Sequence, residues 1–205
     1  MTNLGTGGSA YNAQLKNSAS ISTSIGSYAV GTGAATFSAA TSDYIQINNQ
    51  SLSFGTNGMS FAFWFRANGV ASQARILDFG NGAGIDNVLV HFTSNTLGAD
   101  VFKTPTLSRD GQIAWGGGNM NDNTWRHAVW TIDANSNWLF YLNGALVTSY
   151  PGVVYPNNVA RQYNYLGRSG WTGDPYFNDE IDEFYLFSYV ITATQAGALY
   201  NQKST

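Results

Sequence analysis

Residues Trp125–Val147 read WRHAVWTIDANSNWLFYLNGALV, and this stretch decides the fold. Residues 127–132 alternate between two faces, with Ala, Trp and Ile sharing one of them, as in a pleated β-strand. The Asp and Asn residues at 133–137 predict a turn, because both residue types tolerate left-handed backbone and cap their own turns. Asn143-Gly144 is a strong hairpin signal, since a type I′ turn needs positive φ at both central residues. The stretch therefore predicts two strands and the start of a third in an antiparallel meander.

Working outward, the densest apolar run is MSFAFWF at Met59–Phe65. Its three Phe side chains share one face and Ala62 and Trp64 share the other, so we expect a central strand that is covered on both sides. A short helix is predicted after Thr192, a residue that caps helix N-termini. Alternation and turn residues predict further strands at residues 35–37, 44–47, 75–79, 86–92, 97–102, 112–115, 163–168 and 179–187, the first two as a hairpin. Short strand pieces are also expected at Ile21, Ile25, Tyr28 and Val30.

The central stretch also resembles a known family. Trp125-Arg-His127-Ala-Val129, Asp133 and Phe140-Tyr-Leu-Asn-Gly144 are similar to the W-x-H-x-V, D and L-Y-x-N-G signature of laminin-G-like jelly rolls, which belong to the concanavalin A-like lectin/glucanase superfamily. The apolar run with Trp64 and the closing strand with its Ile-Asp-Glu also resemble this family, although residues 178–180 lack the glycine that the family usually has there.

This resemblance runs from about residue 4 to residue 201. It implies an all-β jelly-roll sandwich of two antiparallel sheets with a short C-terminal helix, in which residues 1–205 form a single domain. Residues 1–36 are rich in Gly, Ser, Ala and Thr, and a disordered tail is the alternative there. We expect an ordered edge instead, because this segment partly resembles the opening of the same modules.

Composition narrows the class of protein. Charged residues make up 10% of the chain, against about 25% in an average domain, and polarity comes from uncharged residues instead. Such a surface suits an extracellular or particle-surface protein, a virion protein for example. The net charge of −3 argues against nucleic-acid and anionic-membrane partners, which need clustered Lys and Arg. The absence of cysteine excludes disulfides and thiolate metal sites.

Targeting signals are also missing from the sequence. The N-terminal residues show neither the charged nor the apolar region of a signal peptide, and no apolar run approaches the roughly 20 residues of a membrane span. We therefore expect no membrane insertion. Either the protein is made and used without Sec export, as in a particle assembled in the cytoplasm such as a virion, or the sequence is a processed or recombinant piece. Asn49-Gln50-Ser51 fits the N-glycosylation pattern, but without a signal peptide a chance match is the better explanation.

The sharpest enzymatic candidate is Glu180-Ile-Asp182-Glu183, because related glucanases in the resembling superfamily carry E-x-D-x-E or E-x-D-x-x-E on one strand. Retaining hydrolysis needs two carboxyl groups about 5–5.5 Å apart. By strand alternation Glu180 and Asp182 share a face, Phe184 takes the next place on it, and Glu183 points to the opposite face. The closing glutamate is missing, so we predict that the chain has no catalytic residues and that these carboxylates are structural. His91 and His127 are the only histidines, and no nucleophile-elbow motif accompanies them.

A calcium site is the next candidate, since the resemblance implies that one Ca²⁺ can bind at a rim of the sandwich through oxygen ligands. Asp78 with Asn81, and Asp86 with Asn87, flank a Gly-rich loop that could fold its oxygens inward, and Asp174 is a more distant candidate. The competing interpretation is that these residues cap ordinary turns.

Glycan binding is the remaining candidate, because sugars are held by aromatic stacking and by amide or carboxylate hydrogen bonds. Trp171 and Tyr176 in the loop SGWTGDPYF have no alternating partner, so we expect them to be exposed. Trp115 stands before three glycines and is expected to be exposed as well. Side-chain amides follow it at Asn119, Asn121 and Asn123. The alternative is that these aromatic residues close the end of the sandwich.

Three functional hypotheses follow. The first is a glycan- or protein-binding module for adhesion or recognition, which the aromatic loop and the lectin-like resemblance favour. The second is a structural subunit of a larger particle, such as a capsid-associated or decorating protein, whose partners would be other subunits. The third, a glycoside hydrolase, is disfavoured by the missing carboxylate.

Overall fold

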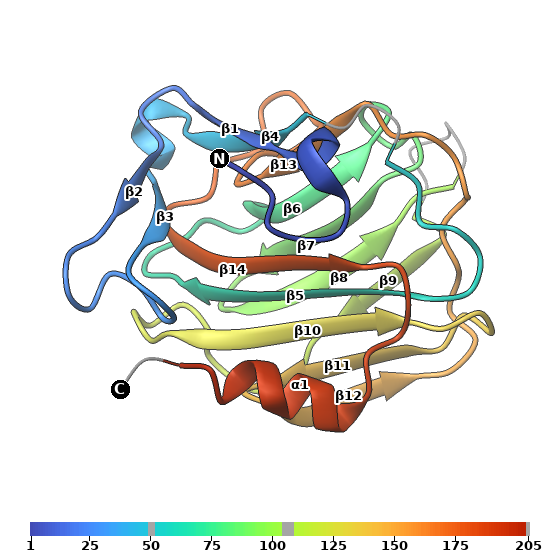
Figure 1. Ribbon diagram of the computed structural model, residues 1–205. Coiled ribbons are helices and arrows are strands. Elements are labelled where there is room, and N and C mark those ends of the chain that lie inside the picture. Colours follow the sequence, from blue (N-terminus) through green and yellow to red (C-terminus); the bar gives the residue numbers. More distant parts are fainter. Residues whose placement is uncertain (49–51, 104–108, 204–205) are drawn as a thin grey trace.

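The structure is a computed structural model that describes residues 1–48, 52–103 and 109–203. Across these residues the chain forms two antiparallel sheets of seven strands each, packed face to face, with a helix at the C-terminal end (Figure 1). The predicted all-β jelly-roll sandwich is therefore confirmed. The glycosylation pattern at residues 49–51 lies outside the described residues.

The first sheet, which we call sheet A, has the order β1-β4-β13-β6-β7-β8-β9. Its strands are β1 (Ala13–Lys16), β4 (Tyr44–Ile47), β13 (Tyr163–Leu166), β6 (Arg75–Gly80), β7 (Val88–Thr93), β8 (Thr96–Val101) and β9 (Gly111–Ala114). Sheet B has the order β12-β11-β10-β5-β14-β3-β2. Its strands are β12 (Ala145–Tyr150), β11 (Trp138–Leu142), β10 (Arg126–Ile132), β5 (Met59–Arg66), β14 (Asp179–Phe187), β3 (Ala34–Phe37) and β2 (Ser20–Ser22). Two 3-10 helices, η1 (Gly8–Tyr11) and η2 (Ala39–Thr41), and the helix α1 (Ala193–Tyr200) complete the elements.

The predicted meander is confirmed as β10-β11-β12 at one edge of sheet B. Asn143 and Gly144 form its second turn with φ of 50° and 79°, as a type I′ turn requires. In the first turn, Asp133 Oδ1 accepts the backbone N–H groups of Asn135 and Asn137 at 2.8 and 2.9 Å. Local sequence therefore determines both turns.

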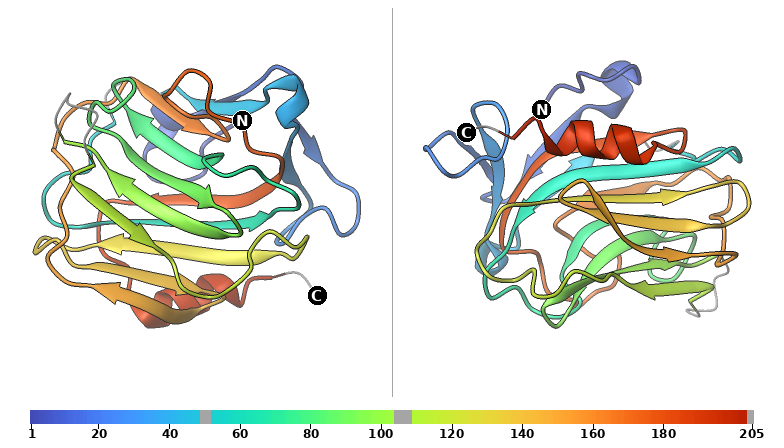
Figure 2. Two further views of the ribbon diagram at one scale, coloured as in Figure 1. Left: turned by 180° about the vertical axis from the view of Figure 1, so that it is seen from behind. Right: turned by 90° about the horizontal axis from the view of Figure 1, so that it is seen from below.

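Strand β5 lies between β10 and β14 and is buried on both faces, as predicted. Its Phe side chains join the core between the sheets, while Trp64 points outward and is still only 1% exposed. Helix α1 covers this outer face of sheet B (Figure 2), and Tyr200 stacks on Trp64 with 5.5 Å between the ring centroids. Thr192 and Gln195 form a capping box that begins the helix. Among the described residues, no helix has the length and apolar content needed to cross a membrane.

The N-terminal segment is ordered, as expected, and supplies an edge to each sheet: β1 to sheet A and β2 to sheet B. The hairpin predicted from residues 35–37 and 44–47 is wrong, because β3 belongs to sheet B and β4 to sheet A. Buried Asp43 fixes this crossing by accepting the backbone N–H groups of Ser18 and Ser38 at 2.8 and 3.0 Å. Ile21 lies in β2, but Ile25, Tyr28 and Val30 lie in the loop that follows it, with Ile25 97% exposed.

Strand β14 departs from regular geometry at two positions. A bulge between Asp182 and Tyr185 places Glu183 at φ 46° and puts its side chain in contact with the Tyr185 hydroxyl. The prediction that Glu183 points away from Asp182 is therefore wrong, because the bulge interrupts the alternation. The second position is Asp179, at φ 101°. Glycine adopts such a backbone conformation without strain.

We predict that Asp179→Gly stabilises the fold. A non-glycine residue at such a φ stores about 1–3 kcal/mol of strain, of which the flexibility of glycine in the unfolded chain cancels about 0.5–1 kcal/mol. The lost ion pair with Arg66, 3.6 Å long and partly exposed, contributes little. The free energy of unfolding should rise by about 1 kcal/mol and Tm by about 2–4 °C, measured by denaturant and thermal unfolding.

Asp179→Asn is the matched control, since it keeps the strained backbone and removes only the charge. Burial, together with the neighbouring Glu180, raises the pKa of Asp179 to about 7. Because this pKa lies above the unfolded value of about 3.9, wild-type stability should fall as pH rises from about 4 to 7. The pKa of Glu180 is lowered, so its opposite effect is confined to lower pH. Both variants should reduce the change in the free energy of unfolding between pH 4 and pH 7. Only Asp179→Gly should be more stable than the wild type at pH 4. Equal stability of the two at that pH would contradict the strain argument.

Candidate functional site

Four tyrosines gather on the outer face of sheet A, and we call them the tyrosine patch: Tyr44 of β4, Tyr163 and Tyr165 of β13, and Tyr176 of the following loop. The rings of Tyr44 and Tyr165 meet edge to face with their centroids 5.5 Å apart. Tyr163 stacks on Tyr165 at 6.3 Å, and Tyr176 lies 6.3 Å from Tyr44. Tyr163 is 44% exposed, so the patch presents aromatic surface to solvent.

Strand alternation accounts for the patch. Ile45 and Leu166 point into the core, so the residues next to them point out of the sandwich. Pairing of β4 with β13 then brings tyrosines from two distant parts of the chain together. Gln46 pairs with Tyr165 in the same row and adds a side-chain amide beside the rings.

Arg168 lies over this patch. Its guanidinium carbon is 4.8 Å from the ring centroid of Tyr44 and 4.7 Å from that of Tyr165. Burial raises the pKa of Tyr165, and the nearby Arg168 charge partly opposes the rise. Gly167 makes this arrangement possible, because its φ is 82° and a Cβ there would come within 2.9 Å of the Phe37 ring. The chain can therefore turn sharply out of β13 and place Arg168 above the rings.

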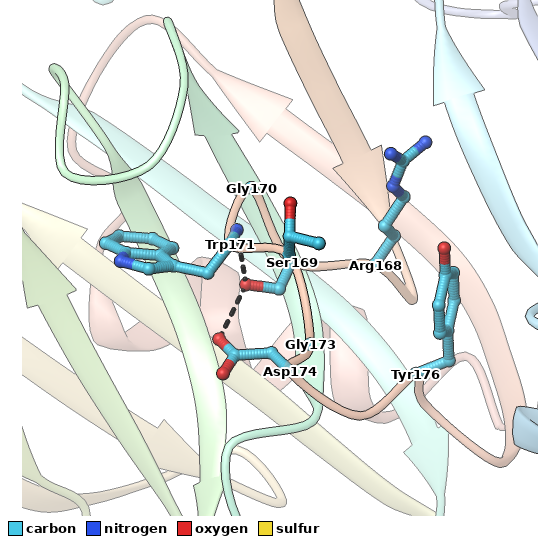
Figure 3. A pocket seen from close by; sticks show the side chains of 8 residues that line it. Arg168, Ser169, Gly170, Trp171, Gly173, Asp174 and Tyr176 are labelled. Atoms are coloured by element: carbon cyan, nitrogen blue, oxygen red, sulfur yellow. Dashed lines mark hydrogen bonds between the residues drawn. The ribbon is translucent and has the colours of Figure 1, made fainter.

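The loop at residues 168–176 is held by its own polar contacts (Figure 3). Its base is closed by a hydrogen bond from the Phe177 N–H to the Gly167 carbonyl at 2.9 Å. Asp174 accepts from Ser169 Oγ at 2.8 Å and pairs with Arg75 at 2.8 Å. Figure 3 shows Arg168 and Tyr176 on one side of the loop and Trp171 on the other.

The loop lines a hollow of about 120 Å³. Pockets that enclose small ligands usually measure about 300–1,000 Å³. The hollow is therefore too small to enclose such a ligand.

The predicted aromatic residues fall in three different environments. Tyr176 belongs to the tyrosine patch. Trp171 is half-buried, with its ring 5.1 Å from that of Phe102 and under the Arg75 guanidinium at 5.5 Å, so it closes the outer face of sheet A. The expectation that Trp115 is exposed is wrong, since it is 3% exposed and its ring lies 4.8 Å from that of Phe140.

The reason is that backbone pairing with β8 extends one residue past the end of β9. The backbone N–H of Trp115 donates to the Leu97 carbonyl at 2.8 Å, and the indole lies in the core. Asn119 and Asn121 do not line the hollow at residues 168–176. The Asn119 side chain accepts the Asn121 N–H, and the Asn121 amide bonds both the N–H and the carbonyl of Val70 at 2.9 Å.

The four predicted calcium ligands form two separate pairs. Asp78 accepts from Asn87 Nδ2 at 2.7 Å and from the Gly170 N–H at 2.8 Å, and it lies 3.8 Å from Arg75. Burial raises the pKa of Asp78 to about 6, an effect that Arg75 partly opposes.

Asp86 accepts from Asn157 at 2.8 Å and lies 3.5 Å from Asn81 Nδ2. N–H donors therefore occupy the carboxylate oxygens of both pairs. Asp174 is engaged by Ser169 and Arg75, and the described residues include no cluster of three acidic or histidine side chains that could hold a metal ion.

The carboxylates of the hydrolase candidate are also engaged. Glu180 forms a two-point pair with Arg66 at 2.6 and 2.7 Å. Asp182 Oδ2 accepts the backbone N–H groups of Ala29 and Val30, each at 2.9 Å. These groups fasten the loop between β2 and β3 onto sheet B, in agreement with the structural role expected for them.

The two histidines lie on different sheets. His91 belongs to β7 and its Nε2 is 3.4 Å from Asp100, whereas His127 belongs to β10 and packs 5.2 Å from the Trp64 ring. Burial lowers the pKa of His127 to about 4, so its ring is neutral at physiological pH. The structure does not bring them together in one site.

Comparison with models of protein families shows which family the chain belongs to. The model of the concanavalin A-like lectin/glucanases superfamily matches residues 39–197. The chain belongs to this superfamily. The suspected laminin-G-like resemblance is thereby confirmed, and a comparison with curated protein sequences found no match.

Solved structures of this superfamily fold resemble the chain at low sequence identity. The binding domain of botulinum neurotoxin serotype G has a TM-score of 0.69 at 17% identity over 94% of this chain and 47% of that one. The binding domain of Paraclostridial Mosquitocidal Protein 1 has a TM-score of 0.67 at 13% identity over 98% of this chain and 49% of that one. The chain thus spans about half the length of these toxin domains.

Domain 4 of AbnA, an extracellular arabinanase of Geobacillus stearothermophilus in complex with arabinotriose, has a TM-score of 0.69 at 14% identity over 95% and 91% of the two chains. At such identities the likeness shows the shared fold.

We predict that calcium leaves the stability unchanged, since N–H donors already occupy the carboxylate oxygens of Asp78 and Asp86. A site with a Kd of about 0.1 mM would add about 2.7 kcal/mol at about 10 mM calcium. Thermal unfolding in calcium and in a chelator should give the same Tm. A rise of several degrees that Asp78→Asn or Asp86→Asn abolishes would restore the calcium hypothesis.

Proposed function

We propose that this chain is a non-catalytic glycan-binding module that acts in adhesion or recognition. The observation that carries the proposal is the tyrosine patch with Arg168 above it, on an outer sheet face that the helix does not cover. We propose further that residues 1–205 act as one such module.

The chemistry of the patch supports this function. Tyrosine rings offer flat apolar faces against which the C–H groups of a sugar can pack, and their hydroxyl groups can exchange hydrogen bonds with sugar hydroxyls. Gln46, and Gln14 opposite it on β1, add amides along the same row. Rigid strands hold three of the four rings, which lowers the entropy cost of binding.

The related structures are compatible with such a role. The arabinanase domain is in complex with arabinotriose, and botulinum neurotoxin DC binding domains are in complex with SialylT and with rat synaptotagmin II. Binding of a protein surface is therefore the nearest alternative within the same class of function.

A second candidate function is that of a subunit in a larger assembly, such as a virion. Leu4 and Ile25 in the N-terminal segment are 96% and 97% exposed, and an apolar side chain so far out of the fold suits a contact with another chain. The mass of the protein isolated from its source tests this candidate, which a free monomer would contradict.

We predict that Tyr163→Ala and Tyr44→Ala each weaken glycan binding by about tenfold or more. Aromatic anchors of this kind commonly contribute more than 1 kcal/mol to binding. The wild-type protein is first applied to a glycan array, and calorimetry with the best ligand then compares the variants.

Tyr189→Ala is the matched control, because Tyr189 is 48% exposed, packs on Phe187 and lies outside the patch. It should bind like the wild type. Loss of binding in all three variants would point to a general effect on the fold, which thermal unfolding reveals. A protein that binds nothing on the array would contradict the proposed function.

A further inference from the structure

We infer that the tyrosine patch selects an acidic glycan, one whose sugar rings carry carboxylate groups. Arg168 and Lys16 are the residues that bind these carboxylates. The inference rests on the proposed function and deepens it by naming the class of ligand.

Arg168 differs from the other arginines of the chain. Among the described residues, each of the others has a carboxylate partner or donates to backbone carbonyls. The pairs are Arg66 with Glu180, Arg75 with Asp174, Arg109 with Asp100 and Arg126 with Asp122, and Arg161 donates to three carbonyls. Arg168 rests on two tyrosine rings, and no described carboxylate lies within 4 Å of it. Its N–H donors are therefore available to a ligand.

Lys16 supplies a second positive charge at the same patch. It lies opposite Tyr44 in the pairing of β1 with β4, so both side chains are on the outer face of sheet A. Its ammonium donates to Gln14, and no described carboxylate pairs with it. Lys16 thus lies across the strand pair from Tyr44, and Arg168 lies above the Tyr44 ring.

The acidic residues around the patch do not neutralise these charges. Asp43, the residue before Tyr44, is buried and accepts backbone N–H groups inside the crossing. Asp174 is held by Ser169 and Arg75 within the loop. Asp78, which pairs with Tyr165 across the strands, is buried with Arg75, Asn87 and the Gly170 N–H as its neighbours. A chain of net charge −3 thus keeps two unpaired cations at its aromatic surface.

This combination matches one ligand chemistry. The faces of sugar rings pack on the tyrosines, and a carboxylate on the ring accepts two N–H groups from a planar guanidinium. A neutral glycan would leave both cations unused. An acidic peptide would use the cations and leave the aromatic faces without ring partners.

The test compares a short oligogalacturonide with its methyl ester, which keeps every sugar ring and removes the negative charges. A glycan array that carries uronic-acid, sialic-acid and neutral glycans extends the comparison to other acidic sugars, and a poly-glutamate peptide tests for simple charge attraction. We expect acidic glycans to bind about tenfold more tightly than their neutral counterparts, since each charge-assisted hydrogen bond is strong.

Arg168→Gln should abolish this preference, and Lys16→Gln should reduce it. Lys203→Gln is the matched control, because it makes the same change in net charge near Trp64 on sheet B. Thermal unfolding checks that each variant is folded. Higher salt should weaken binding of the acidic form more than that of the ester.

The outcomes separate the two proposals. Equal binding of acidic and neutral forms, unaltered in Arg168→Gln, overturns the acidic preference and leaves the glycan-binding function standing. Binding of poly-glutamate as tight as that of the acidic glycans also overturns the inference. Absence of binding to every glycan on the array overturns the proposed function and the inference with it.

Discussion

The burial of β5 on both faces is the constraint on which the rest of the molecule depends. Its Phe side chains fill the space between the sheets, and Trp64 on the other face would meet water if sheet B stood alone. Helix α1 removes that exposure by bringing Tyr200 onto the indole. The two outer faces of the sandwich therefore differ, because the chain covers part of sheet B with its own helix and leaves Tyr163 of sheet A exposed.

Local pattern in the sequence predicts the parts of the fold that local physics determines. Side-chain alternation and the Asn143-Gly144 turn predict the meander, and the apolar run at β5 predicts the central strand. Local pattern does not predict which strands pair when the two strands are far apart in the sequence. The crossing from β3 to β4 and the pairing of β4 with β13 cannot be read from either strand alone. The sequence does not predict the patch for this reason, although Tyr163 and Tyr165 alternate with their neighbours. Among its members, only Tyr176 is predicted as a site residue.

The same pattern of carboxylates on a strand can have a catalytic role in one protein and a structural role in another. Carboxylates on β14 suggest hydrolysis when read as sequence, but a buried carboxylate needs partners, and here the partners belong to the chain itself. Asp182 holds two backbone N–H groups of the β2–β3 loop, and Glu180 holds Arg66, which also donates to the Gly26 carbonyl. Their charge is used to attach a long loop to the sheet. The bulge at Glu183 belongs to this arrangement, and a one-residue irregularity of that kind leaves no clear signal in the sequence.

The edge position of β1 has a thermodynamic consequence. This strand is joined to sheet A by four residue pairs with β4, and short edge strands open at a lower free energy than the whole domain. A ligand that engages both Lys16 and Arg168 binds only when β1 is in place, so occupancy should slow amide exchange along this edge. A change that opens β1 lowers the apparent affinity for such a ligand in proportion to the fraction of molecules in which β1 remains paired. In the proposed binding surface, the first strand of the chain thus contributes to the affinity for a ligand that also contacts residues 163–176.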